Sequence, residues 1–156
     1  QWEWACRGGS DDDFWYGNKN TDFGKKENLA DKTTLLFAVQ GVDPKPMSPN
    51  SSWYKYYTFL PKEKNVDDGQ LIQTGDKVYE ANPFGLYNMH GNVAEWTRSD
   101  YLPYPYKVNN KETSDHKVVR GGSYIERPKF STSHSRKGYY PYQRVFNVGF
   151  RVIIEE

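Results

Sequence analysis

Closely spaced glycines and prolines divide this chain into short segments, and their spacing limits the fold more than any other feature. The 13 glycines and 9 prolines interrupt most stretches before a helical period can develop. The best helical candidate, residues 28–39, contains Thr33 and Thr34 and is followed by Gly41, so we expect a short helix at most. Short strands are expected at Gln70–Gln73, Lys117–Arg120 and Val148–Ile154. The pattern predicts one irregular, loop-rich α+β unit with short strands and little helix.

Nearly half of the hydrophobic residues of the chain are aromatic. Trp, Tyr and Phe make up 17% of the sequence, while all hydrophobic residues together make up 36%. So many rings, with a net charge of only +1, argue against a disordered chain. The balanced charge also argues against nucleic-acid binding. No apolar run reaches the roughly 18 residues that a transmembrane helix needs.

The single cysteine, Cys6, excludes an internal disulfide framework and a metal site built from several cysteines. We interpret it as a buried small apolar residue rather than a nucleophile. Its alternation with Trp2 and Trp4 indicates the beginning of a buried element. The three histidines lack the spacing of a metal site and are interpreted as turn or surface residues: His90, His116 and His134.

The segment 82–101 is rich in oxygen donors around an expected turn at His90 and Gly91. The turn could direct one amide oxygen, two main-chain carbonyls and one carboxylate to a common point, which is the donor set of a calcium ion. Those donors would come from four residues: Asn88, Gly91, Val93 and Glu95. The alternative is an Asn-Gly turn followed by an amphipathic turn in which Glu95 faces water.

A second oxygen-rich cluster pairs Asn28 with the segment 65–71 (NVDDGQL), where Asp67 and Asp68 precede Gly69. Taken alone, this order favours a solvated Asp-Gly turn. The acidic run 11–13 lacks the alternating spacing of an EF-hand loop and is interpreted as a solvated face.

Five ordered blocks resemble one family: WEWACRGG, FWYG followed by NLAD, GLYNMHGNVAEWT, VVRGGSY and NVGFRV. They occur in the order found in the formylglycine-generating enzyme (sulfatase-modifying factor) superfamily, whose fold is related to C-type lectins. The resemblance implies that residues 1–156 are the C-terminal portion of a single domain whose earlier part precedes Gln1. We therefore expect contact with that N-terminal part. We also expect an exported protein, periplasmic or secreted, with a lipid anchor through that part as one option.

The resemblance also implies two structural calcium ions. One would be held by the side chains of Asn88 and Glu95 with the carbonyls of Gly91 and Val93. The other would be held by the side chains of Asn28 and Asp68 with the carbonyls of Leu29 and Gln70. Every side chain required is an oxygen donor in this sequence.

The catalytic pattern of the family is absent. Its enzymes oxidise a cysteine in a CxPxR-type sulfatase motif with two copper-binding cysteines, whose positions are taken here by Glu126 and Ser131. Neither side chain is a thiolate, so no copper(I) is expected. Ala94 replaces a tryptophan that the family often has, whereas Ser123 matches the serine of its active site.

Two functions remain open. The first is a non-catalytic or divergent, calcium-braced module that binds an unknown ligand or protein subunit. The tyrosine-rich stretches Tyr101–Tyr106 and Tyr139–Tyr142 could form its binding face or fill the core. The alternative is an oxidoreductase of the formylglycine-generating or iron-dependent sulfoxide synthase type, for which Tyr101 and Arg127 are candidate substrate contacts. Enzymes of the sulfoxide synthase type take their iron ligands from a separate helical domain.

Overall fold

A computed structural model describes residues 1–40, 43–46, 63–70, 78–105 and 113–154 of the chain. The described elements are short, as the glycine and proline spacing predicts. In chain order they are helix α1 (Trp2–Arg7), the 3-10 helix η1 (Lys32–Leu36), strands β1 (Phe37–Gln40), β2 (Asp43–Pro46), β3 (Ala94–Asp100) and β4 (Lys117–Arg120), the 3-10 helix η2 (Pro128–Phe130), and strands β5 (Lys137–Tyr139) and β6 (Val148–Gly149).

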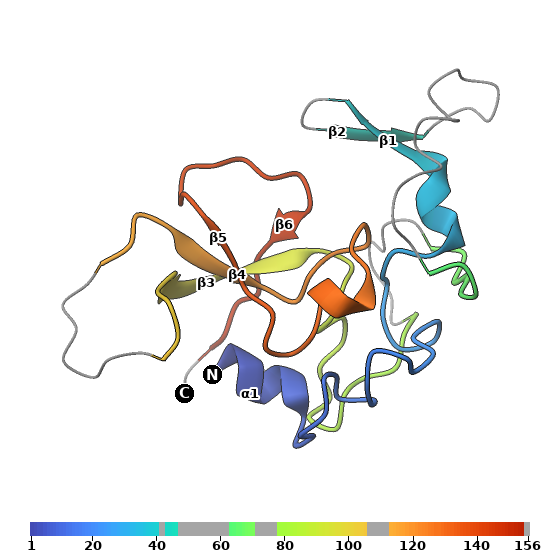
Figure 1. Ribbon diagram of the computed structural model, residues 1–156, viewed down its shortest axis with the longest axis horizontal. Helices are drawn as coiled ribbons and strands as arrows, with labels where there is room; N and C mark the ends of the chain where they lie inside the picture. Colours follow the sequence, from blue (N-terminus) through green and yellow to red (C-terminus); the bar gives the residue numbers. More distant parts are fainter. Residues whose placement is uncertain (41–42, 47–62, 71–77, 106–112, 155–156) are drawn as a thin grey trace.

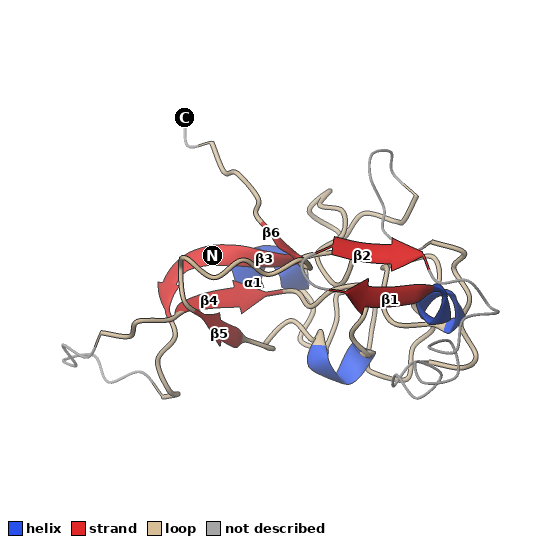
Figure 2. Cartoon of the chain, turned by 90° about the horizontal axis from the view of Figure 1, so that it is seen from above, coloured by secondary structure: helices blue, strands red, loops and turns tan. Residues whose placement is uncertain are grey.

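Four strands form one sheet in the order β5-β4-β3-β6. Strand β4 lies antiparallel to β3 and β5, whereas β6 runs parallel to β3. In the β3–β4 register Glu95 faces Arg120, so an acid and a base from distant segments lie side by side. The hairpin of β1 and β2 is separate and lies, with η1, to one side of this sheet (Figures 1 and 2).

Helix α1 lies against the sheet and ends where the chain turns at Gly8. Gly8 has a φ of +56°, in the left-handed region that glycine adopts readily, and a Cβ there would lie 2.7 Å from Pro83 Cδ. Only Cys6 is buried in the helix, while Trp4 is 70% exposed and contacts Phe84. The interpretation of Cys6 as a buried residue is confirmed, and the segment with Trp2, Trp4 and Cys6 forms a helix in which Cys6 is the buried residue.

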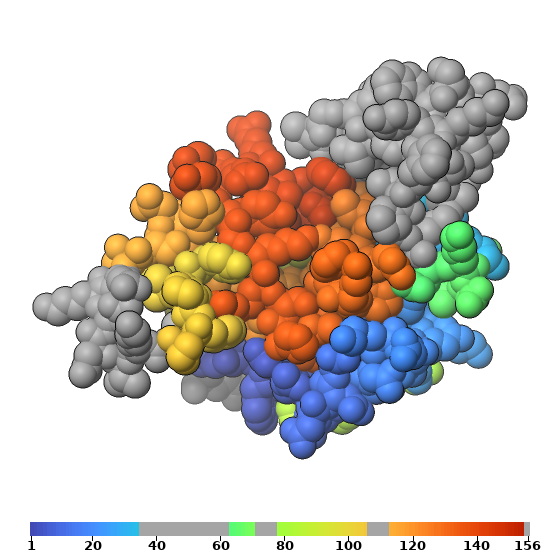
Figure 3. Space-filling model, in the orientation of Figure 1, coloured from blue at the N-terminus to red at the C-terminus, as the bar shows by residue number. Residues whose placement is uncertain are grey.

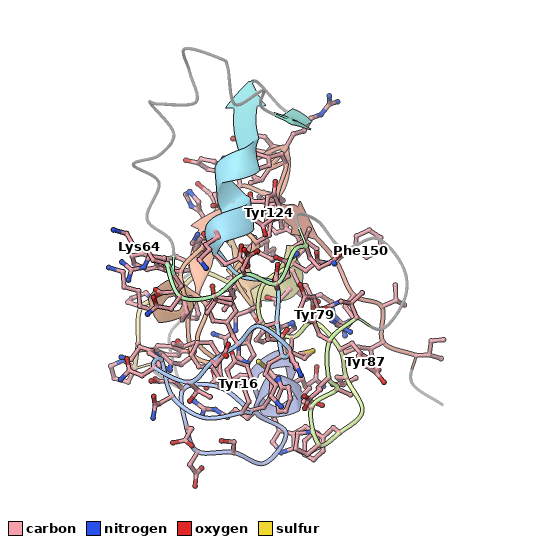
Figure 4. The ribbon with its side chains drawn as sticks, turned by 90° about the vertical axis from the view of Figure 1, so that its right-hand side faces the viewer. Tyr16, Lys64, Tyr79, Tyr87, Tyr124 and Phe150 are labelled. Atoms are coloured by element: carbon pink, nitrogen blue, oxygen red, sulfur yellow. The ribbon has the colours of Figure 1, made fainter. Side chains whose placement is uncertain are left out.

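The core is built from rings and small side chains contributed by loops. Phe14 stacks on Tyr16 at a centroid distance of 5.0 Å and meets the His90 ring edge-on at 4.8 Å. Tyr79 and Tyr124 are buried, with 4% and 2% of their surface exposed, whereas Phe150 is 77% exposed; Figure 4 labels all three residues. The predicted aromatic core and loop-rich α+β class are therefore confirmed. No helix in the described ranges is long and apolar enough to cross a membrane.

Several expected elements differ in extent. Residues 28–39 give only the turn η1, after which Phe37–Gln40 forms strand β1. Strand β4 matches its prediction, but the strand expected at Val148–Ile154 covers only Val148–Gly149, because no described strand pairs with the residues that follow. Strand β3 is not among the expected strands; it pairs with β4 and β6, which lie far from it in the sequence. Residues 71–73 of the strand expected at Gln70–Gln73 lie outside the described residues.

Candidate functional site

The two positions where the family has cysteines lie together in the structure. After β4 the chain bends at Gly121 and Gly122, with φ values of +89° and +73°, and η2 then returns it toward the bend. A Cβ placed on Gly122 would lie 2.1 Å from Ser131 Oγ and 3.1 Å from Glu126 Oε2. Only glycine leaves room at this position, so the side chains of Glu126 and Ser131 converge over it.

The oxygens of this pair are buried and partly unsatisfied. Glu126 Oε1 forms an ion pair with Lys137. Glu126 Oε2 and Ser131 Oγ are buried without a hydrogen-bond partner among the described residues. Burial lowers the pKa of Lys137. Unpartnered buried oxygens are rare and indicate a position for a water or ligand group that donates hydrogen bonds.

A hollow of about 400 Å³ adjoins the pair, on the side where η2 and β5 meet. Figure 3 shows this face, where the orange-coloured residues of the segment around 120–140 surround it. Arg127 reaches from the hollow to Glu63, with its Nε 2.8 Å from Glu63 Oε1. The lining residues are Ile125, Glu126, Arg127, Phe130 and Lys137. Arg127 is thus placed at the site, whereas Tyr101, the other candidate contact, does not line this hollow.

Ser123 is fixed beside this site rather than poised as a nucleophile. Its Oγ accepts a hydrogen bond of 2.7 Å from Asn147 Nδ2, and both residues are buried. An amide cannot remove a proton from a hydroxyl, so this contact positions Ser123 without activating it. The site therefore offers a carboxylate, two hydroxyls and an ammonium group, all of which are hard groups unsuited to copper(I).

The first predicted cation cluster surrounds Glu95. Glu95 is only 5% exposed, so it does not face water as the alternative interpretation required. Its Oε2 accepts a 2.8 Å hydrogen bond from Trp2 Nε1, and Arg151 Nη2 lies 2.7 Å from Oε1. The same Nη2 donates to the carbonyl of Tyr87 at 2.9 Å. The oxygens that meet the Arg151 guanidinium are therefore those of Glu95 and of Tyr87, and Tyr87 is not among the four predicted donor residues.

Asn88 and Gly91 shape that loop through left-handed backbone, with φ values of +54° and +81°. The Asn88 carbonyl lies 3.5 Å from Arg151 Nη2. Val93 packs its side chain toward Gly149, at 3.2 Å from a Cβ placed there. A buried carboxylate beside main-chain oxygens is the donor type that a hard cation such as calcium accepts, but here both oxygens of Glu95 already accept hydrogen bonds from Trp2 and Arg151.

The second predicted cluster is centred on Asp68. Its Oδ1 accepts from Gln70 N at 2.7 Å and its Oδ2 accepts from Tyr79 Oη at 2.8 Å. Its main-chain N–H donates to Asp31 Oδ2 at 2.7 Å. Burial, together with the charge of Asp31, raises the pKa of Asp68 to about 6. Two neighbouring carboxylates also fit a hard cation, which would remove their mutual repulsion.

Asp31 is the residue of this cluster that the sequence interpretation missed. It is 1% exposed, and the only signal for it was its place in the NLAD block. Asn28 and Leu29 are also 1% exposed. Among the described residues no group of three or more His, Cys, Asp or Glu side chains gathers around one point, so each cluster depends on main-chain and amide oxygens as well.

His90 is a core residue, which corrects its interpretation as a turn or surface residue. It is fully buried, with Nδ1 2.7 Å from the Ser131 carbonyl and Nε2 3.2 Å from Cys6 Sγ. Because a carbonyl can only accept, Nδ1 carries the proton and Nε2 accepts from the thiol. Burial lowers the pKa of His90 to about 4, so the ring is neutral and structural.

Comparison with known proteins places the whole chain in one family model. The model described as Sulfatase-modifying factor enzyme 1-like domain matches residues 1–156. Inactive C-alpha-formylglycine-generating enzyme 2 of Mus musculus is 37% identical over 111 residues, which are 60% of this chain and 33% of that protein. Formylglycine-generating enzyme of Streptomyces coelicolor is 31% identical over 102 residues, 59% of this chain and 32% of that protein. The chain thus spans about a third of the length of these relatives.

Solved structures support the same fold. Treponema denticola variable protein 1 superposes with a TM-score of 0.63 and 19% identity, over 96% of this chain and 43% of the other. PvdO from Pseudomonas aeruginosa gives a TM-score of 0.59 and 22% identity, over 96% and 48%. At these identities the two structures establish the irregular, C-type-lectin-like fold and nothing about activity.

Proposed function

Because the chain belongs to the sulfatase-modifying factor enzyme 1-like family, we propose that it is a non-catalytic or divergent member that binds a ligand or a protein subunit. The observation that carries this proposal is the replacement of the cysteine pair by Glu126 and Ser131, which converge over Gly122. Two oxygens cannot provide the thiolates that copper(I) requires. The mouse relative is described as inactive, which is consistent with a non-catalytic function for this chain.

The unpartnered oxygens of Glu126 and Ser131 support binding in place of catalysis. Each accepts hydrogen bonds, and the adjoining hollow is lined partly by Ile125 and Phe130. A ligand group with N–H or O–H donors and an apolar body would suit both features. Lys137 would remain as the partner of the carboxylate.

Exposed tyrosines support a second part of the binding surface. The rings of Tyr140 and Tyr142 stack with their centroids 5.3 Å apart, and the centroid of the His116 ring lies 4.0 Å from that of Tyr140. Tyr142 is 81% exposed and Tyr104 56% exposed, so these rings do not fill the core. Exposed rings with polar tips are common in surfaces that bind other molecules.

Calcium is proposed as the brace of this surface. Glu95 and Asn88, with the carbonyls of Gly91 and Val93, would hold one ion. Asn28 and Asp68, with the carbonyls of Leu29 and Gln70, would hold the other. Bound calcium would neutralise buried carboxylates and fix loops that have little regular structure. Sites with so few carboxylates resemble the weak sites of extracellular modules, which supports the proposal of an exported protein.

Removing calcium tests the brace. We expect a chelator to lower the melting temperature by about 5–10 °C, because an ion bound only to the folded state stabilises it by mass action. Asp68→Asn should lose much of this response. Asp67→Asn is the matched control, since Asp67 is exposed and contacts only Thr33 among the described side chains. An identical melting curve with and without chelator would refute the proposal that calcium stabilises this surface.

The alternative, an oxidoreductase, gains no specific support from the described histidines. They lie apart, with His90 beside Cys6 and the ring of His116 packed at a tilt against that of Tyr140. The main chain of His134 accepts a hydrogen bond from Arg120.

A further inference from the structure

Arg151 brings its own positive charge into the oxygen cluster at Glu95. Its Nε lies 3.1 and 3.2 Å from the two carboxylate oxygens, and its Nη2 lies 2.7 Å from Oε1. The Nη2 group also donates to the Tyr87 carbonyl at 2.9 Å. The guanidinium therefore contacts both a side-chain and a main-chain oxygen of the loop assigned to calcium.

The charge of Glu95 is already balanced in this arrangement. With Trp2 donating to Oε2, both carboxylate oxygens have donors, and the Glu95 side chain is 7% exposed. A second positive group on the same carboxylate would be repelled by the guanidinium, because the two positive charges would lie only a few ångströms apart. Asp68 differs, since its oxygens accept from the neutral groups Gln70 N and Tyr79 Oη.

We propose that Arg151 is the built-in counter-cation of Glu95 and sets the calcium affinity of this cluster below that of the Asp68 cluster. This inference rests on the proposed calcium sites. It makes the two clusters unequal, although the resemblance to the family assigns an ion to each. The residue responsible lies two positions beyond β6, in a segment whose neighbours Phe150 and Val152 are 77% and 72% exposed.

Terbium titration of the intact chain tests the affinity directly. Terbium replaces calcium in oxygen sites and emits light when a nearby indole absorbs, and Trp2 is bonded to Glu95. We expect Arg151→Gln to bind terbium at the tryptophan-sensitised site at least about tenfold more tightly than the wild type. Adding Glu95→Gln to that variant should abolish the gain. Arg144→Gln, at an exposed arginine outside the cluster, should match the wild type.

A measurement on the wild type keeps the test independent of whether the variant folds. In nuclear magnetic resonance spectra the Trp2 indole N–H reports on Glu95, and the Gln70 amide reports on Asp68. During a calcium titration the Gln70 resonance should shift first and the Trp2 resonance only at higher calcium. Simultaneous shifts, or equal terbium affinities in the wild type and a folded Arg151→Gln variant, would overturn the role proposed for Arg151 but leave the calcium proposal standing. No response at either cluster would overturn the calcium proposal as well.

Discussion

Asn28 and Gly91, one from each proposed calcium cluster, meet in a backbone contact that leaves no space for a side chain. The Asn28 carbonyl accepts a 2.7 Å hydrogen bond from Asn92 N, and the Gly91 Cα faces it. A Cβ on Gly91 would lie 1.9 Å from Asn28 O. The loops that carry the two clusters are therefore joined through their main chains.

Substitution of Gly91 tests this contact. Gly91→Ala adds a positive-φ strain of about 1–2 kcal/mol and an overpacking cost of about 1–3 kcal/mol, so we expect a loss of about 2–5 kcal/mol in unfolding free energy. Urea unfolding measures it. Gly85→Ala is the control, because Gly85 has a φ of +77° but nothing lies within 4 Å of its Cβ position. Equal losses in the two variants would show that the contact with Asn28 contributes nothing.

Arg120 links α1 to the segment before β5, and its replacement by another basic residue should destabilise the protein. Its Nη1 donates to the carbonyls of His134 and Ser135 at 3.0 and 2.9 Å, and its Nη2 pairs with Glu3. Lysine keeps the charge but cannot reach all three acceptors, so Arg120→Lys should cost about 2–3 kcal/mol in unfolding free energy. Arg144→Lys should change it by less than about 0.5 kcal/mol. A similar small change for Arg120→Lys would contradict the role given to its fork of hydrogen bonds.

Cys6 should make stability depend on alkaline pH. Burial raises the pKa of its thiol above the unfolded value of about 8.5. Above that pH the unfolded thiol ionises while the folded one stays protonated, so the unfolding free energy of the wild type should fall relative to Cys6→Ala as pH rises. Urea unfolding of both proteins between pH 7 and about pH 10 measures the difference. A constant difference across this range would contradict the burial of the thiol.

Native Cys6 should also resist alkylation at any pH in that range. It is fully buried, and its Sγ lies 3.2 Å from His90 Nε2. We expect the Cys6 thiol to be alkylated only as fast as the chain unfolds. Mass spectrometry of the alkylated protein, with and without urea, measures this rate. Rapid labelling of the folded protein would show that the thiol is accessible.

Local sequence patterns predicted the irregular α+β class, strand β4 and the burial of Cys6, because turn spacing, β-branched runs and small apolar residues leave local traces. The burial of His90 had no such trace, since its partners Ser131 and Cys6 lie 41 and 84 positions away. The same holds for Arg151, which reaches Glu95 across 56 positions. The placement of Glu126 and Ser131 at one point came from the family resemblance, and composition alone could not have indicated it.

The most direct test of the proposed non-catalytic function is the formylglycine-generating reaction itself. The protein, with copper and oxygen supplied, is incubated with a CxPxR-type sulfatase peptide, and the peptide mass is followed beside an active formylglycine-generating enzyme as the positive control. Because Glu126 and Ser131 replace the thiolates, we predict an unchanged peptide mass and no tight binding of copper(I). The mass loss that accompanies conversion of the peptide cysteine to formylglycine would contradict the proposed non-catalytic function.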